Sequence, residues 1–208
     1  LFSLLIFSSI NYADYFDYIY KDRNPSYNSF GQVGLIQTPS AKTNGEDSII
    51  FVLNTNDMWK FGTLTVTPFN WLEASYFYYR PNDLAWQSNQ KRGDYLDKGF
   101  NVKFSYKPKK NLPTIALGLD DIGGTGYFAR EYIVSTIEKE SFNLTIGMGW
   151  GKFKNISSIS NPLKYLNKKF ETRRGASKDF KQGGNFSYDT WFRGDVSLFG
   201  GLEIYLPK

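Results

Sequence analysis

Apolar and polar residues alternate along much of the chain with a period of two. In residues 141–150, Phe142, Leu144, Ile146, Met148 and Trp150 share one parity, and only Asn, Thr and Gly lie between them. Residues 99–107 and 113–121 show the same alternation. Because successive side chains of a β-strand point to opposite faces, each segment is predicted to form a strand with one apolar face and one small or polar face.

Eight β-strands are predicted, separated by turns rich in Asn, Asp, Gly and Pro. The expected strands are residues 47–54, 59–67, 71–80, 99–107, 113–121, 127–138, 141–151 and 193–206. Helical periodicity of comparable strength is missing, and the best helical candidate is a short turn near residues 162–167. The expected fold is therefore all-β, an antiparallel meander of about eight strands.

The composition of the two rows of each strand indicates which face is wet. A soluble β-sandwich turns its apolar rows inward and places charges on its outer rows. Here the partner rows are mostly Gly, Ser, Thr or Asn, a pattern typical of transmembrane barrels with lipid-facing apolar rows. We therefore expect the strands to form part of a transmembrane β-barrel, or a small barrel by themselves. The alternative is a soluble, secreted β-sandwich or barrel that binds carbohydrate through surface aromatics.

Aromatic residues make up 18% of the chain, which is more than a core of this size needs. Such rings favour the interface between lipid and water. The five tryptophans lie at or near predicted strand ends, and we interpret them as an interfacial belt, although rings that cover the turns of a core would be placed in the same way. They are Trp59, Trp71, Trp86, Trp150 and Trp191.

The chain divides into three regions. Residues 1–13 form an apolar run ending in Ala13, which resembles the remnant of a secretory signal peptide. Residues 14–29 are expected to form an irregular lead-in. Residues 30–208 form the predicted barrel region, which we expect to be truncated at its C-terminus.

The residue types restrict the chemistry. The chain contains neither His nor Cys, which excludes Ser/His/Asp triads, Cys/His dyads and most zinc or iron sites. Asp120 and Asp121 are adjacent, and neighbours on a strand are expected to point to opposite faces, so they cannot act as a glycosidase pair. The glycines that follow lack phosphate-binding spacing. We expect no enzymatic activity, no cofactor and no metal.

Four charged residues are assigned to the polar rows of their strands: Glu73, Lys103, Asp120 and Glu131. If the apolar rows face lipid, these residues line the interior of the barrel. One hypothesis is that they contact a polysaccharide. The ordinary alternative is that they solvate or brace the lumen, because interior charge is common in barrels.

The basic character of the chain lies in one segment. Residues 152–181 hold nine Lys or Arg and two acidic residues, a net charge of +7, whereas the whole chain carries +5. We predict a long mobile loop at about residues 152–190, which binds acidic polysaccharide or lipopolysaccharide or is simply solvated. Nucleic acid is not an expected partner, since no recognised motif is present. The candidate residues are Lys164, Lys168, Lys169, Arg173, Arg174 and Lys178.

Five blocks in a fixed order carry a family resemblance. They are residues 30–41 (FGQVGLIQTPSA), 68–74 (PFNWLEA), 97–104 (DKGFNVKF), 116–126 (ALGLDDIGGTG) and 144–151 (LTIGMGWG). Together they resemble the N-terminal part of the YjbH family. The resemblance implies an outer-membrane β-barrel associated with exopolysaccharide and capsule operons of Gram-negative bacteria, and a fragment of a longer barrel. The partners it implies are outer-membrane lipid, polysaccharide and other proteins of an export system.

Overall fold

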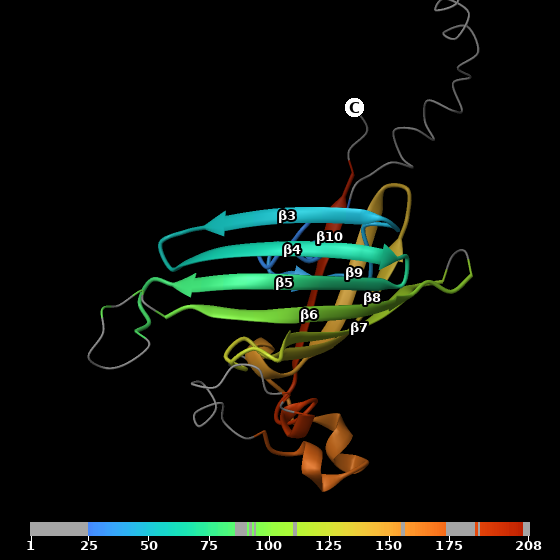
Figure 1. Ribbon diagram of the computed structural model, residues 1–208. Coiled ribbons are helices and arrows are strands. Elements are labelled where there is room, and N and C mark those ends of the chain that lie inside the picture. Colours follow the sequence, from blue (N-terminus) through green and yellow to red (C-terminus); the bar gives the residue numbers. More distant parts are fainter. Residues whose placement is uncertain are drawn as a thin grey trace, which may run out of the picture.

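The computed structural model describes residues 25–85, 91, 93, 95–109, 112–154, 157–173, 186 and 188–205. One antiparallel sheet of eight strands dominates them (Figure 1), and each strand pairs with the next in the chain. Its strands are β3 (Ser48–Thr55), β4 (Trp59–Phe69), β5 (Leu72–Pro81), β6 (Asp97–Tyr106), β7 (Thr114–Ile122), β8 (Arg130–Glu138), β9 (Phe142–Gly149) and β10 (Ser197–Ile204). The predicted all-β meander of about eight strands is confirmed.

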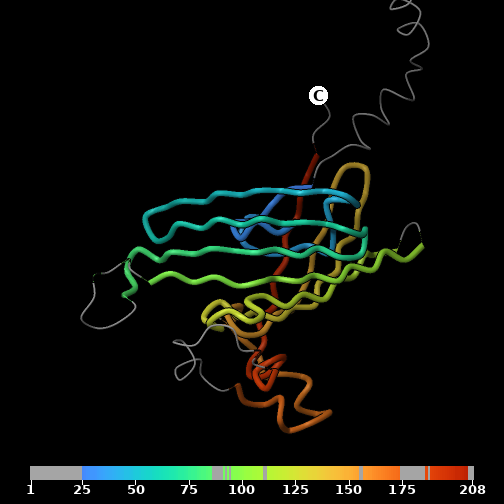
Figure 2. The backbone as a smooth tube through the Cα atoms, viewed as in Figure 1, coloured from blue at the N-terminus to red at the C-terminus, as the bar shows by residue number. Residues whose placement is uncertain are grey.

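The sheet is strongly twisted. β3 to β6 run across the view, whereas β9 and β10 cross them steeply (Figures 1 and 2). Such twist follows from the right-handed twist of each strand. Within the described residues, β3 and β10 each pair with one neighbour only and the sheet does not close, so the barrel stays a prediction.

The two faces of the sheet differ in polarity, and the distribution is the reverse of that in a soluble sandwich, because the exposed face is apolar and the covered face is mainly polar. On one face, here called the outer face, large apolar side chains are exposed. They include Ile49, Phe51, Leu64, Phe100, Leu117, Ile133, Ile146 and Leu198. The other face, the inner face, buries mainly small polar side chains. They include Thr63, Thr65, Ser75, Asn101, Thr136 and Thr145.

Residues 26–41, here called the covering segment, lie over the inner face. Within this segment, β1 (Gly34–Leu35) and β2 (Thr38–Pro39) are strands of two residues each that pair as a hairpin. Tyr27 makes an isolated bridge with Val33. Gly31 is required here, because its φ is +77° and a Cβ would lie 2.6 Å from the Cβ of Thr63. The hairpin was not predicted. Residues 1–24, which include the expected signal-peptide remnant, lie outside the described residues.

The chain between β9 and β10 is here called the β9–β10 insert (residues 150–196), and its described part projects beyond the sheet (Figure 2). Its described part contains the short 3-10 helices η2 (Gly151–Phe153), η3 (Pro162–Tyr165), η4 (Lys168–Phe170) and η6 (Tyr188–Thr190). η3 confirms the helical turn expected near residues 162–167. In the described part of the chain, none of the helices has the length and apolarity to cross a membrane.

The assignment of Trp150 to an exposed apolar row is wrong. β9 ends at Gly149, and the chain turns into η2, so Trp150 no longer follows the alternation of the strand. Its side chain is 1% exposed and packs edge to face on Phe192 at a centroid distance of 5.2 Å. Trp150 therefore anchors the insert and does not belong to an interfacial belt.

Candidate functional site

A buried ion pair lies at the centre of the inner face. Glu73 of β5 and Lys103 of β6 are register partners, and Lys103 Nζ lies 2.9 Å from Glu73 Oε1. Both side chains are at most 1% exposed, because Val33 of the covering segment closes over them. Lys103 Nζ donates to the carbonyl of Val33 at 3.2 Å, and the Val33 amide donates to Glu73 Oε1 at 3.4 Å. This geometry fits the alternative in which both residues brace the interior and do not contact a polysaccharide.

A second cluster joins β7, β8 and the covering segment. Arg130 Nε donates to Asp120 Oδ2 at 2.7 Å, and Gln32 Nε2 donates to Asp120 Oδ1 at 2.6 Å. The Arg130 guanidinium also donates to Gln32 Oε1 at 3.2 Å and lies 4.1 Å from the ring centroid of Phe30. Asp120 is thus on the inner face as predicted, with both carboxylate oxygens occupied. Sequence reasoning missed Arg130 and Gln32, although Gln32 lies in the first of the five family blocks.

Glu131 does not belong to the inner face, which corrects its predicted placement. It pairs in register with Leu119 and shares the outer row of β8 with Ile133. Both rows of β8 mix polar and apolar residues, so the alternation did not reveal which row faces inward. Glu131 is nevertheless 1% exposed, because the β9–β10 insert covers it.

Arg173 of the predicted basic loop is the partner of Glu131. Its two terminal nitrogens donate to the two carboxylate oxygens at 2.5 and 3.0 Å, and the Phe192 amide adds a third hydrogen bond at 3.1 Å. Such a bidentate pair is a strong anchor. Arg173 therefore fastens the insert to β8 and is not a free cation for a ligand.

The other candidate basic residues differ in their surroundings. Lys168 and Lys169 are exposed on η4. Lys164 is half-buried and donates to Ser160 Oγ at 2.6 Å. Arg174 and Lys178 lie outside the described residues. A polysaccharide contact by the exposed lysines remains a prediction.

Asp120 and Asp121 are both buried, which contradicts the expectation that they point to opposite faces. The pairing of β7 with β6 shifts register at this point, and Asp121 has a φ of +60°. This irregularity turns Asp121 inward, where its Oδ2 accepts from the Phe128 amide at 2.9 Å. The strict alternation assumed from the sequence therefore fails at the end of β7.

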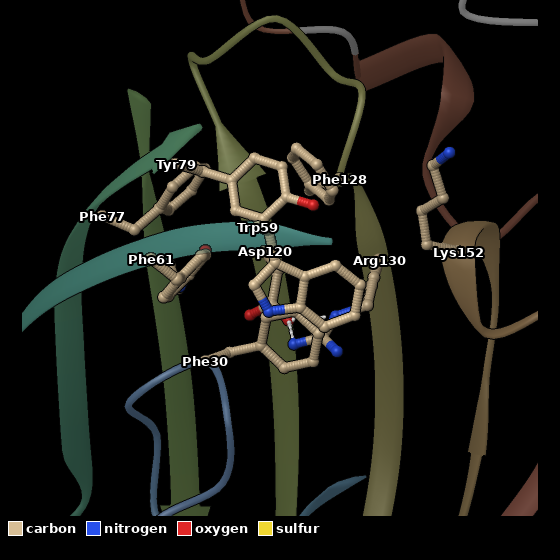
Figure 3. A pocket seen from close by; sticks show the side chains of 10 residues that line it. Phe30, Trp59, Phe61, Phe77, Tyr79, Asp120, Phe128, Arg130 and Lys152 are labelled. Carbon is tan, nitrogen blue, oxygen red and sulfur yellow. Dashed lines mark hydrogen bonds and ion pairs between the residues drawn. The ribbon is translucent and has the colours of Figure 1, made fainter. Parts of the chain in front are cut away.

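A cavity of about 190 Å³ opens at one end of the inner face (Figure 3). Its aromatic wall comes from the covering segment, β4, β5 and the β7–β8 connection. The rings are Phe30, Trp59, Phe61, Phe77, Tyr79 and Phe128. Its polar wall consists of Asn101, Asp120, Arg130 and Lys152. Trp59, which the sequence placed in a lipid interface, instead lines this cavity.

Lys152 is the least constrained charge of the cavity. Its Nζ lies 3.9 Å from the ring centroid of Tyr127, and burial lowers the pKa of the ammonium from its usual value. None of the ion pairs formed among the described residues involves Lys152. The cavity thus combines flat apolar rings, a fixed Asp120–Arg130 pair and one further cation.

Comparison with known proteins identifies the family. The family model YjbH, described as exopolysaccharide biosynthesis protein YbjH, matches residues 26–208. The chain belongs to the YjbH family. The match includes the whole covering segment, so the segment that closes the inner face lies within the family region.

One relative within the curated proteins is an Escherichia coli (strain K12) protein named "Uncharacterized lipoprotein YjbH". It is 35% identical over 187 residues, which cover 88% of this chain and 26% of the relative. The chain therefore spans about a quarter of the length of this YjbH relative. No solved structure matches the chain.

Proposed function

We propose that this sheet is part of the wall of an outer-membrane β-barrel with a non-enzymatic role in exopolysaccharide or capsule biosynthesis and export in a Gram-negative bacterium. The observation that carries the proposal is the inverted polarity of the sheet. Exposed apolar rows extend across all eight strands, whereas the covered face is mainly polar. Hydrocarbon can cover such rows, whereas in water they would form an unusually large apolar patch. The family description and the lipoprotein name of the relative support an envelope role.

The two edge strands support a larger barrel. β3 exposes Phe51 and Leu53, and β10 exposes Leu198 and Leu202, so both edges present apolar side chains to their surroundings. In hydrocarbon each unpaired backbone group at an open edge would cost several kcal/mol. We therefore assign the pairing of both edges to further strands of the full-length protein, whose relative is about four times longer than the matched region.

The connections suggest an orientation. One end of the sheet, here called the long-connection end, carries the two longest connections, residues 82–96 and 150–196, together with residues 56–58 and 123–129. The other end carries residues 70–71, 107–113 and 139–141. Outer-membrane barrels have short periplasmic turns and longer extracellular loops. The cavity and the β9–β10 insert would then face the outside of the cell.

The proposed partners follow from this arrangement. Outer-membrane lipid would contact the outer face, and polysaccharide would contact the long-connection end. Other proteins of the export system would bind elsewhere on the full-length protein, and neither nucleic acid nor a cofactor is included. The lack of His and Cys supports the non-enzymatic role, because it excludes Ser/His/Asp triads, Cys/His dyads and most zinc or iron sites.

Membrane fractionation tests the proposal against the soluble carbohydrate-binding alternative, for which the aromatic cavity is the favouring observation. The full-length protein should stay in the outer-membrane fraction after carbonate extraction. Single-tryptophan variants sharpen the test with brominated lipids. Trp71 stacks on Phe104 of the outer face and should be quenched, whereas Trp59 in the inner cavity should not. Release by carbonate, together with equal quenching of both residues, would reject the membrane wall.

A further inference from the structure

The inner face changes character at the cavity. Along β4 the buried row consists of Thr67, Thr65 and Thr63, and it then becomes aromatic at Phe61. β5 shows the same change, from Ser75 to Phe77 and Tyr79. Small hydroxyl residues suffice to line a polar wall, so the rings at this end need a separate reason.

These rings surround a hollow that the protein does not fill. The hollow has a volume of about 190 Å³ and is partly open to solvent, so it has room for a ligand larger than a single water. Phe61 and Phe77 are stacked at 5.7 Å, and Tyr79 meets Phe128 edge to face at 4.1 Å, so the rings hold one another in place. The aromatic wall is therefore preorganised for a flat ligand.

The opposite wall is suited to hydroxyl groups and to one negative charge. Gln32 fixes both Asp120 and Arg130, and these two side chains offer acceptors and donors at defined positions. Among the described residues, the ammonium of Lys152 is held only over the ring of Tyr127. A ligand that carries hydroxyls, an apolar ring face and a carboxylate would match all of these groups.

We propose that the cavity is a saccharide subsite that takes one uronic acid residue of a polysaccharide, with the sugar ring against the aromatic wall and its carboxylate beside Lys152. The sugar class rests on the proposed function in exopolysaccharide export. The preference for an acidic sugar comes from the charge of Lys152, which pairs with no acidic side chain among the described residues. The cavity lies where Phe30 of the covering segment meets the β9–β10 insert, at the long-connection end of the wall.

A binding experiment on the full-length protein in detergent tests this subsite. The probes are a fluorescently labelled hexasaccharide of galacturonic acid and labelled maltohexaose, which is neutral. Lys152→Gln should weaken binding of the acidic hexasaccharide about fivefold by removing one half-exposed charge interaction. Lys154→Gln is the matched control, because Lys154 is two residues away and pairs with Asp195 at 2.8 Å on the surface.

The aromatic wall is tested separately. Trp59→Leu should weaken binding about tenfold through loss of ring stacking, as for bases stacked on aromatic side chains. Trp71→Leu, an exposed tryptophan on the other end of the sheet, should bind as the unaltered protein does. Folding of each variant is checked by gel electrophoresis, in which a folded barrel that has not been heated migrates differently from the same protein after heating.

Two results would overturn the subsite. One is equal affinity for the acidic and the neutral hexasaccharide, and the other is unchanged binding by folded Lys152→Gln and Trp59→Leu. If the protein resists carbonate extraction but fails the binding assay, the proposed membrane wall stands and the subsite is rejected. If the protein binds the acidic probe as predicted but is released by carbonate, the subsite stands and the membrane wall is rejected.

Discussion

Lys103 and Glu73 form a buried ion pair from which solvent is excluded. Removing one partner of a buried ion pair leaves an uncompensated charge, which costs about 3–5 kcal/mol, whereas apolar replacement of both is often neutral. We predict that Lys103→Met lowers the free energy of unfolding of the full-length protein by that amount. Lys103→Met combined with Glu73→Leu should recover most of the loss. Urea unfolding followed by tryptophan fluorescence measures both, and a single variant as stable as the double variant would contradict the bracing role.

Gly118 marks a close approach between neighbouring strands. It pairs in register with Tyr132, and a Cβ at this position would overlap the Tyr132 ring, which is fully buried and cannot move aside. We predict that Gly118→Ala destabilises the protein by about 1–3 kcal/mol, the usual cost of overpacking. Gly62→Ala is the control, since its Cβ would lie 3.4 Å from the Leu53 side chain. Equal urea midpoints for the two variants would show that the contact is unimportant.

The covering segment is held to the inner face of the sheet mainly by hydrogen bonds. Ala41 donates its amide to Thr136 Oγ1 at 2.9 Å and accepts from Ser105 Oγ at 2.6 Å, and Gly31 accepts from Thr65 Oγ1 at 2.6 Å. Hydroxyl groups of at least three strands thus take the place that apolar side chains occupy in a soluble core. The segment is therefore a structural part of the inner face.

Cysteine cross-linking tests this placement, because the native chain contains no Cys. We predict that Ala41→Cys combined with Thr136→Cys forms an intramolecular cross-link with a short bismaleimide in the folded full-length protein. Ala41→Cys combined with Ile133→Cys should not form the cross-link, because Ile133 lies on the outer face of the strand that carries Thr136. Mobility on a denaturing gel distinguishes the two, and equal cross-linking would mean that the segment does not cover the inner face.

Alternation of side chains was sufficient to predict the eight long strands but not the short hairpin that precedes them. β1 and β2 are two residues long, too short for any periodicity. The covering segment that contains them makes its hydrogen bonds to strands far along the chain, which a local pattern cannot reveal. Glu131 and Asp121 were misplaced where a strand mixes polarity or changes register. The cavity was missed although Phe61 and Phe77 continue rows of Thr and Ser, which is the signal that could have predicted it.

At the scale of the whole molecule, the proposed function depends on whether lipid or water surrounds the outer face. Leu117 lies near the middle of β7 on this face, in register with Phe104 and Ile133. Tyr106 lies on the same face at the end of β6 and is 69% exposed. In water, a charge at either position would be well solvated and would change stability little. In a bilayer, the cost of a charge depends on its depth.

We predict that Leu117→Arg lowers the free energy of unfolding of the protein in lipid vesicles by about 2–4 kcal/mol, the cost of an arginine at the bilayer midplane. Tyr106→Arg should lose at most about 1 kcal/mol, because a strand end lies near the interface. Urea titration of the full-length protein refolded in vesicles measures the difference. A depth-dependent penalty requires hydrocarbon against the outer face, so equal and small penalties at the two positions would remove the membrane wall.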